Sequence, residues 1–196
     1  LVSTFTIIRQ LAFIRKSDTG YVSDNIINIR LNDPEIRKNP DFLLNELAKS
    51  PYLDEFATST DLPSSVSSAT MGKWDGKPDE VNLTIYNFGI DEKFIDFFRM
   101  KIIDGRGFSD DFSDGKQNNC IINQTAAKRI GWTEPVGKRF WLDSKNIGTV
   151  VGVIKDFNFV PLNLPVEPLV LYPVPSGEYS QINSVSVRIN HLNFSE

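Results

Sequence analysis

Apolar and polar residues alternate in several short stretches of the chain. Residues 25–31 alternate and are rich in isoleucine, and residues 81–85 alternate Val, Leu and Ile with Asn and Thr. A period of two is typical of a β-strand with one buried face. On this pattern and on short apolar runs, we predict strands at residues 25–31, 52–60, 81–85, 100–103, 119–123, 139–142, 149–154, 169–172 and 185–189.

Three short helices are predicted from their start and stop signals. Asn39-Pro40 supplies an N-cap and a proline at the first helical position, and Pro51 ends the helix that follows. Asp91 is expected to cap a second helix, whose apolar side is formed by phenylalanines and an isoleucine. Residues 124–130 form a third helix that stops at Gly131, a left-handed C-cap.

The order of these elements predicts the fold class. A β-α-β unit is followed by a mixed insertion and then by further strands, which favours an α+β fold with two lobes. Residues 61–79 are rich in serine, proline and glycine, so they are the best candidate for the crossing between lobes. We expect residues 21–65 and 165–196 to form one lobe, and residues 66–164 to form a second lobe inserted into it.

The first residues of the chain have a wide apolar face. Leu1, Phe5, Ile8 and Ala12 follow helical spacing, and a second apolar stripe lies beside them. The chain contains no run of about 18 apolar residues, so no segment of it spans a membrane by itself. From the pattern alone two interpretations stay open: the last turns of a membrane helix, or an amphipathic helix packed on the domain.

The composition excludes several kinds of site but indicates no catalytic chemistry. Hydrophobic residues make up 40% of the chain and charged residues 23%, with a net charge of -4, which is ordinary for a globular protein. Lysine and arginine do not cluster along any segment, so neither a nucleic-acid groove nor an anionic membrane surface is expected. The single cysteine, Cys120, cannot form an intrachain disulfide. We interpret it as a small buried hydrophobe, with a reactive thiol as the alternative.

Residues that commonly carry catalysis are scarce. The sole histidine, His191, lies near the chain end, which is a poor place for a catalytic triad. One cysteine and one histidine also exclude a structural zinc cluster. Two glycine–lysine stretches, 72–77 and 131–138, do not have the Walker A spacing, so no ATP site is predicted.

Two further patterns have a plain interpretation beside a functional one. Asp110, Asp111, Asp114 and Gly115 resemble half of a calcium loop, but Phe112 occupies a ligand position. We therefore expect a solvated acidic turn, with weak calcium binding as the alternative. Three tryptophans could line a sugar-binding cleft, although a core or interface position is more common. They are Trp74, Trp132 and Trp141.

Five motifs follow one another along the chain. They are QLAFIRK at 10–16 with GY at 20–21, DEKF at 91–94, GRGFS at 105–109, INQTAAK at 122–128 continuing through GW to PVGK at 135–138, and VVGVIKDFNF at 150–159, which leads to EPLV at 167–170. Together they resemble the extracytoplasmic, or periplasmic, core domain of MacB/FtsX-like ABC transporter permeases, in the form abundant in Bacteroidetes. Asn158 stands where that family often has histidine, and Asp104 where it has glutamate.

The residues that carry this resemblance are expected to shape the lobe and to take no part in a reaction. Asn123 and Thr125 are expected to cap a helix, and Lys155-Asp156 to mark the exit from a buried strand. The glycines expected to adopt positive φ in tight turns are Gly105, Gly107, Gly131 and Gly137. The full set of motif residues is Gly105, Arg106, Phe108, Asn123, Ala126, Ala127, Gly131, Trp132, Gly137, Lys138, Gly152, Lys155, Asp156, Phe157 and Pro168.

The resemblance also implies an architecture and partners. It implies a ferredoxin-like β-α-β porter lobe with an inserted mixed α/β lobe, and it favours residues 1–20 as the end of a membrane helix and its stalk. Family members continue past the final strand with another helix and strand, so the porter lobe is expected to be truncated at the C-terminus. Expected partners are a cytoplasmic ATP-binding subunit or domain, a second permease protomer, a periplasmic adaptor or substrate protein, and the membrane through flanking helices. Nucleic acid is not an expected partner.

We therefore expect a non-catalytic domain on the periplasmic side of the bacterial inner membrane, part of a multi-pass protein. It would transmit ATP-driven motion to a periplasmic substrate or partner, in efflux, export or lipoprotein-type transport, and it would need no cofactor or metal. One alternative is a periplasmic ligand-binding module for peptide, lipid or glycan, with a concave apolar pocket. Another is a hydrolase that depends on His191 or Cys120.

Overall fold

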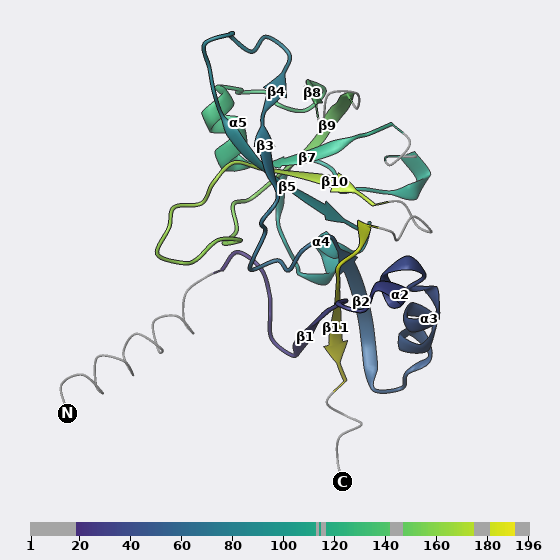
Figure 1. The fold of residues 1–196 in the computed structure, drawn as a ribbon. Coiled ribbons are helices and arrows are strands. Elements are labelled where there is room, and N and C mark those ends of the chain that lie inside the picture. The colour runs from purple at the N-terminus through teal and green to yellow at the C-terminus, as the bar shows by residue number, and fades with distance from the viewer. Residues whose placement is uncertain (1–18, 113, 115–116, 142–146, 175–180, 191–196) are drawn as a thin grey trace, which may run out of the picture.

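The computed structural model describes residues 19–112, 114, 117–141, 147–174 and 181–190 (Figure 1). The predictions for the apolar segment at residues 1–16 and for His191 lie outside the described residues. None of the helices in the described part is long and apolar enough to cross a membrane.

The described residues form one large mixed sheet with a few short helices. The strands are β1 (Ile26–Arg30), β2 (Leu53–Ser59), β3 (Ala69–Met71), β4 (Lys73–Trp74), β5 (Thr84–Ile90), β6 (Ile102–Gly105), β7 (Cys120–Asn123), β8 (Arg139–Trp141), β9 (Ile147–Ile154), β10 (Leu169–Pro173) and β11 (Ser184–Ile189). The helices are α2 (Pro34–Lys38), α3 (Asp41–Lys49), α4 (Phe94–Phe97) and α5 (Gln124–Ile130), with a 3₁₀ turn at Asp110–Phe112. Hydrogen bonding gives the order β1-β11-β2-β5-β10-β7-β9-β8-β4, with β3 on β5 and β6 on β9.

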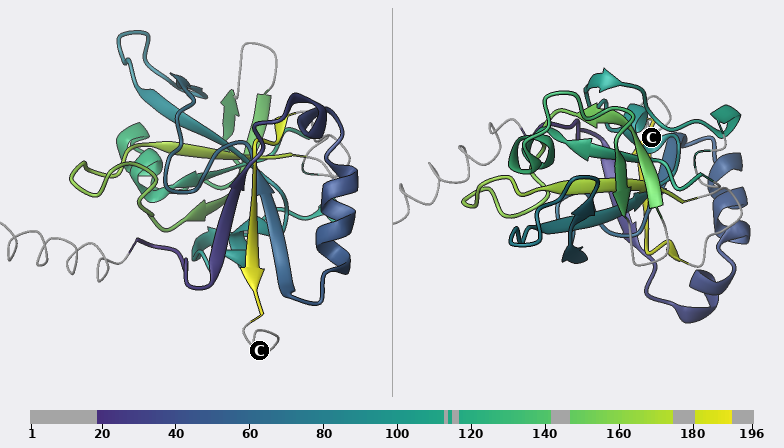
Figure 2. Two further views of the ribbon diagram at one scale, coloured as in Figure 1. Left: turned by 60° about the horizontal axis from the view of Figure 1, so that its bottom comes forward. Right: turned by 90° about the horizontal axis from the view of Figure 1, so that it is seen from above.

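One end of this sheet is an antiparallel group. Strand β11 lies between β1 and β2, and α2 and α3 stand beside these strands (Figures 1 and 2). The group has a small core of its own, to which β11 contributes Val185 and Val187 and α3 contributes Leu44. Because β11 pairs with strands more than a hundred residues earlier, the group is completed only by the last part of the described chain.

The other end is a mixed group in which β7 and the first residues of β10 are buried on both faces. Strands β5 and β10 pair in parallel, as do β7 and β9. Alternate residues of β7 point to opposite faces: Ile121 joins a phenylalanine-rich core with α4, and Ile122 joins a second core with α5. These two groups agree with the predicted α+β fold of two lobes.

The position of β10 bears on the lobe boundaries. Residues 165–196 were expected to complete the first lobe, and by strand pairing β11 does so. Strand β10, however, pairs with β5 and β7 of the second group. The boundaries at residues 65 and 165 therefore remain a prediction.

The largest difference from the predicted elements lies before α3. Pro40 occupies the N-cap position of α3, and no side chain caps this helix. Asn39 instead forms the C-cap of α2, a helix that was not predicted. The N-cap and proline that do start a helix are Asp33 and Pro34, six residues earlier, at the start of α2. The Asp33 carboxylate accepts hydrogen bonds from the amides of Glu35 and Ile36.

Several strands start later than their patterns indicated, or were missed. Strand β5 begins at Thr84 and runs to Ile90, because its register is set by β3 and β10. Strand β6 begins at Ile102, since Met100 still hydrogen-bonds back to Ile95 beyond α4. Strands β3 and β4 were not predicted and lie inside the stretch 61–79 that was expected to be the crossing between lobes; β3 pairs with β5, and β4 pairs with β8.

Candidate functional site

The motif residues meet around the carboxyl ends of β7 and β9. Asn123 is the last residue of β7, Asp156 follows β9, and Pro168 precedes β10. Helix α5 starts at the same place, directly after Asn123. Asn123 thus comes together with two segments that lie more than thirty residues later in the chain.

Asn123 joins three of these segments. Its Oδ1 accepts hydrogen bonds from the amide of Ala126, at 2.8 Å, and from the amide of Leu169, at 2.9 Å. Its Nδ2 donates to the carbonyl of Glu167, at 2.9 Å. The residue is completely buried, so water does not replace these bonds. The predicted N-cap role is confirmed, and the side chain also holds the start of β10.

Asp156 ties the exit of β9 to the same helix. Its two carboxylate oxygens accept hydrogen bonds from the amide and the hydroxyl of Thr125, at 2.9 and 2.7 Å. The Asp156 amide in turn donates to Oε1 of Gln124 at 3.3 Å. Thr125 was predicted to cap the helix, and this prediction is wrong, because its amide and hydroxyl donate to Asp156. A carboxylate at this position also interacts favourably with the helix dipole.

Gly105 and Gly152 allow β6 to cross close to β9. A Cβ on Gly152 would lie 2.2 Å from the carbonyl oxygen of Arg106, and a Cβ on Gly105 would lie 2.2 Å from that of Val151. Gly105 also has a φ of +68°. Positive φ is confirmed for Gly105, Gly131 and Gly137, but Gly107 does not adopt it, so that expectation was wrong.

Arg106 forms a bidentate ion pair with Asp114. The two guanidinium nitrogens donate to the two carboxylate oxygens at 2.7 and 2.8 Å, and the guanidinium lies 4.0 Å from the ring centre of Phe112. The amide of Ser109 and the side chain of Asn119 also donate to Asp114, which is only 2% exposed. The expectation of a solvated acidic turn is therefore wrong for Asp114.

The electrostatics of this pair follow from these contacts. Burial alone would favour the neutral form of Asp114, but the hydrogen bonds from Arg106, Asn119 and Ser109 outweigh it and lower the pKa of the carboxyl. The hydrogen bond to Asp114 likewise raises the pKa of Arg106. The carboxylate is thus engaged in holding the loop before β7. In the described part of the chain, no group of three or more metal-ligating side chains gathers.

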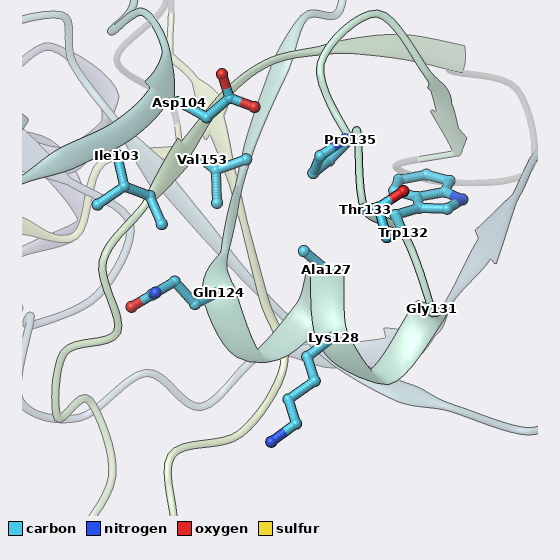
Figure 3. Close-up of a pocket in the computed structure, with 10 residues that line it drawn as sticks. All are labelled: Ile103, Asp104, Gln124, Ala127, Lys128, Gly131, Trp132, Thr133, Pro135 and Val153. Carbon is cyan, nitrogen blue, oxygen red and sulfur yellow. The ribbon is translucent and has the colours of Figure 1, made fainter.

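A groove lies beside this framework, between α5 and strand β6 (Figure 3). It has a volume of about 480 Å³, with Ala127 and Val153 at its floor and Trp132 at one side. The opposite side carries Ile103 and Asp104. The full lining is Ile103, Asp104, Gln124, Ala127, Lys128, Gly131, Trp132, Thr133, Pro135 and Val153.

Comparison with known proteins identifies the architecture. Residues 3–192 match the model of the MacB-like periplasmic core domain. The chain belongs to this family. The MacB-like domain is also similar in fold to the periplasmic region of MacB from Actinobacillus actinomycetemcomitans, with 20% identity, 91% of this chain and 80% of that chain covered, and a TM-score of 0.59. A search of the curated proteins gave no match.

A second solved structure gives the same result. The extracellular domain of the noncanonic ABC-type transporter YknZ, from Gram-positive bacteria, shares 22% identity with this chain. The similarity covers 85% of this chain and 84% of that chain, with a TM-score of 0.57. Both solved structures therefore support the same fold, that of a MacB-like periplasmic core domain.

The remaining motif residues of the MacB-like domain are either buried in its cores or hydrogen-bonded through their backbone, or they lie exposed on its surface. Ala126, Phe108 and Phe157 are buried in the two central cores. The carbonyl of Pro168 accepts a hydrogen bond from the amide of Tyr86 on β5. Lys138 is exposed, and its backbone carbonyl accepts a hydrogen bond from the amide of Val150 on β9. Lys155 is also exposed.

The other candidates from the sequence fall in different places. Cys120 is completely buried, and burial raises the pKa of its thiol, so its interpretation as a small buried hydrophobe is confirmed. The three tryptophans do not gather in one cleft: Trp74 is buried, Trp132 lines the groove, and Trp141 lies on β8. The sequence analysis did not predict that Arg106 and Asn119 both bind Asp114. The short loop between the motifs at 105–109 and 122–128 was the only sequence signal for these contacts.

Proposed function

We propose that this domain transmits ATP-driven motion of a permease to a substrate or partner in the periplasm, and that it catalyses no reaction. The permease would work as a dimer with a cytoplasmic ATP-binding subunit or domain, and the domain would stand on the outer side of the inner membrane. Family membership supports the setting. The contacts of the segment that leads into β1 support the mechanical role.

The single observation that carries the proposal is the anchoring of residues 19–22. The amide of Val22 donates to the carbonyl of Phe98 at 2.9 Å, and the amide of Asn158 donates to the carbonyl of Thr19 at 2.8 Å. The Tyr21 ring meets Phe98 and Phe157 edge-on, with ring centres 5.6 and 6.1 Å apart. A displacement of this segment would therefore reach α4 and the end of β9 directly.

The carboxyl end of the described chain reaches the same helix. Arg188 of β11 stacks on the ring of Phe97 at 4.9 Å, and its guanidinium also donates to the Phe97 carbonyl. Its Nε pairs with Glu55 of β2 at 2.8 Å. Strand β11 runs beside β1, with Arg188 opposite Ile26. Both ends of the described chain thus contact α4, which packs into the main core.

The experiment measures motion between the two groups of strands in the full permease. Spin labels are placed at Ala48→Cys on α3 and Asp79→Cys before β5, both exposed, while Cys120 is too buried to react. We expect the distance between labels to change when the ATPase is trapped with nucleotide. We also expect Tyr21→Ala to reduce this change while ATP hydrolysis continues.

The matched control is Phe42→Ala on α3, since this ring is 76% exposed. It should leave the nucleotide-dependent distance change intact. A distance that is identical with and without nucleotide, in a permease that hydrolyses ATP, would overturn the proposed transmission. The isolated chain should hydrolyse no ATP, and stoichiometric hydrolysis by the pure chain would overturn its non-catalytic assignment.

The groove beside α5 favours a second candidate, a periplasmic binding module for a peptide, lipid or glycan. An apolar floor with a few polar groups at the rim is typical of ligand sites. Saturable calorimetric binding of one such ligand, lost in Trp132→Ala but retained in Trp141→Ala, would make this function the leading one. Its absence across the three ligand classes would exclude it.

A further inference from the structure

The outward face of β4, β8 and β9 combines apolar and cationic side chains. Across the three strands, Lys73 is opposite Trp141 and Trp141 is opposite Ile147. In the neighbouring row, Arg139 is opposite Thr149. Residues two apart on a strand share a face, so Arg139 lies on the same side as Trp141. The opposite face holds the buried residues Trp74 and Phe140.

Two cations converge on one indole. The Lys73 ammonium lies 5.2 Å from the ring centre of Trp141, and the Arg139 guanidinium lies 5.6 Å from it. Each contact is favourable, but bringing two like charges together opposes that gain. Within the part of the chain that the structure describes, neither cation forms an ion pair with a carboxylate. Asp75, an exposed acid directly after β4, pairs with neither.

The other arginines that stack on described rings differ in this respect. Arg106 stacks on Phe112 and pairs with Asp114 at 2.7 Å. Arg188 stacks on Phe97 and pairs with Glu55 at 2.8 Å. Among the described residues, Arg139 stacks on its ring without such a partner.

We propose that this face, defined by Lys73, Arg139, Trp141 and Ile147, binds an acidic segment of a partner protein. Carboxylates of the segment would pair with the two cations, and an apolar side chain would rest on the exposed Ile147 beside the half-buried Trp141. An apolar centre with a tryptophan and an arginine is typical of interface positions that dominate binding energy. The uncompensated charges select an acidic partner over a basic one.

Other anionic occupants fit less well. A sugar ring would need a free indole face, whereas Lys73 and Arg139 already lie over the Trp141 ring. Strands β1 and β4 are the two ends of the sheet order, and Figure 1 shows them at opposite ends of the molecule. This argument rests on the proposed function, in which the β1 end of the sheet would be nearer the membrane. The face on β4 would then lie far from the membrane, which disfavours lipid headgroups.

The test uses the 196-residue chain and the synthetic peptide acetyl-Glu-Leu-Glu-Leu-Glu-amide, with the Gln-for-Glu peptide as its control. In an NMR titration the Trp141 indole signal should shift with the acidic peptide, and the Trp74 and Trp132 signals should not. The double variant Lys73→Glu with Arg139→Glu should weaken binding by about tenfold or more at low salt. Binding should also weaken as salt is added.

A matched variant, Arg37→Glu with Lys38→Glu, makes the same change in net charge at exposed residues of α2. It should leave the affinity for the peptide unchanged. An equal loss in both variants, or a shift at Trp132 in place of Trp141, would overturn the inference, because binding would then depend on net charge or on the groove. The wild-type titration decides the matter even where a variant does not fold.

The outcomes also separate the other occupants. Binding of phosphatidylglycerol vesicles or of polygalacturonate, with no binding of the acidic peptide, would replace the protein partner with lipid or glycan and so overturn the inference. The titration needs neither ATP nor the membrane helices. Failure here therefore leaves the transmission proposal standing, and failure of the spin-label experiment leaves peptide binding intact.

Discussion

At the scale of single residues, Asn123 is a fully buried polar side chain at the end of β7 that makes three hydrogen bonds. The sequence indicated its N-cap role, because an asparagine directly before a short helical run is a local signal. Its bonds to Glu167 and Leu169 could not be predicted, since they join residues more than forty positions apart. The buried strand before it gave no indication that β10 would start beside its last residue.

Replacing Asn123 tests this triple role. Asn123→Ala removes a helix cap and leaves the Leu169 amide and the Glu167 carbonyl without their partner, so the free energy of unfolding should fall by about 3 kcal/mol or more. Asn39→Ala is the matched control, because Asn39 is exposed and its side chain was wrongly predicted to form the N-cap of α3. It should change the free energy by less than about 0.5 kcal/mol. Urea unfolding measures both, and equal losses would contradict the role given to Asn123.

A pair of glycines separates two kinds of constraint. Gly131 has a φ of +86° but open space around a Cβ, so Gly131→Ala should cost only the left-handed strain, about 1 kcal/mol. At Gly152 a Cβ would meet the Arg106 carbonyl, so Gly152→Ala must separate β6 from β9 and should cost more than Gly131→Ala. Thermal unfolding of the two variants gives the comparison. A smaller loss at Gly152 would show that the crossing is loose.

The Asp114–Arg106 pair predicts a response to acid. Because the pKa of Asp114 is lower in the folded chain than in the unfolded chain, its stabilisation is complete above the unfolded value, about 3.9, and is lost as the pH falls through the folded value. Asp114→Asn should be less stable than wild type at neutral pH and should depend less on pH in the acid range. Unfolding measured from pH 7 to 3 tests this. Parallel curves for the two proteins would contradict it.

At the scale of elements, local signals succeeded where they could decide alone. Helix α5 has an N-cap, an apolar face and a left-handed glycine within ten residues, and its predicted bounds agree with the structure. Strand β9 is a long apolar run and was found as well. Strands β3 and β4 are two or three residues long, and their existence depends on the register of β5 and β8. No local pattern contains that information.

Helix α5 also offers a prediction at this scale. Asp156→Ala removes both bonds to Thr125, so the first turn of α5 should open more often, and amide hydrogen exchange across residues 125–131 should speed up by about tenfold. Exchange in β11, in the other group of strands, should not change. Asp79→Ala, an exposed acid, is the control. Uniform acceleration through the whole domain would instead show that Asp156 contributes to global stability only.

At the scale of the whole molecule, the five motifs predicted more about the protein than the hydrophobic patterns did. Strand alternation supported an α+β class with two lobes, but the order of strands in the sheet could not be read from it. The five motifs pointed to the family, and the family model matches residues 3–192. They did not indicate what role these residues have in the fold. The structure supplies that role, since Thr125 and Asn123 of one motif are hydrogen-bonded to Asp156 and Leu169 of another.

The position of β11 between β1 and β2 has a consequence for biosynthesis. Strand β2 ends at Ser59, whereas β11 begins at Ser184, so two finished strands wait for their central neighbour while the intervening chain is made. At ordinary rates of translation this wait lasts roughly ten seconds. During that time β1 and β2 present unpaired edges, which are prone to wrong pairing. A chaperone that shields them, or early folding of the inserted strands, would determine how much of the newly made protein reaches its native state.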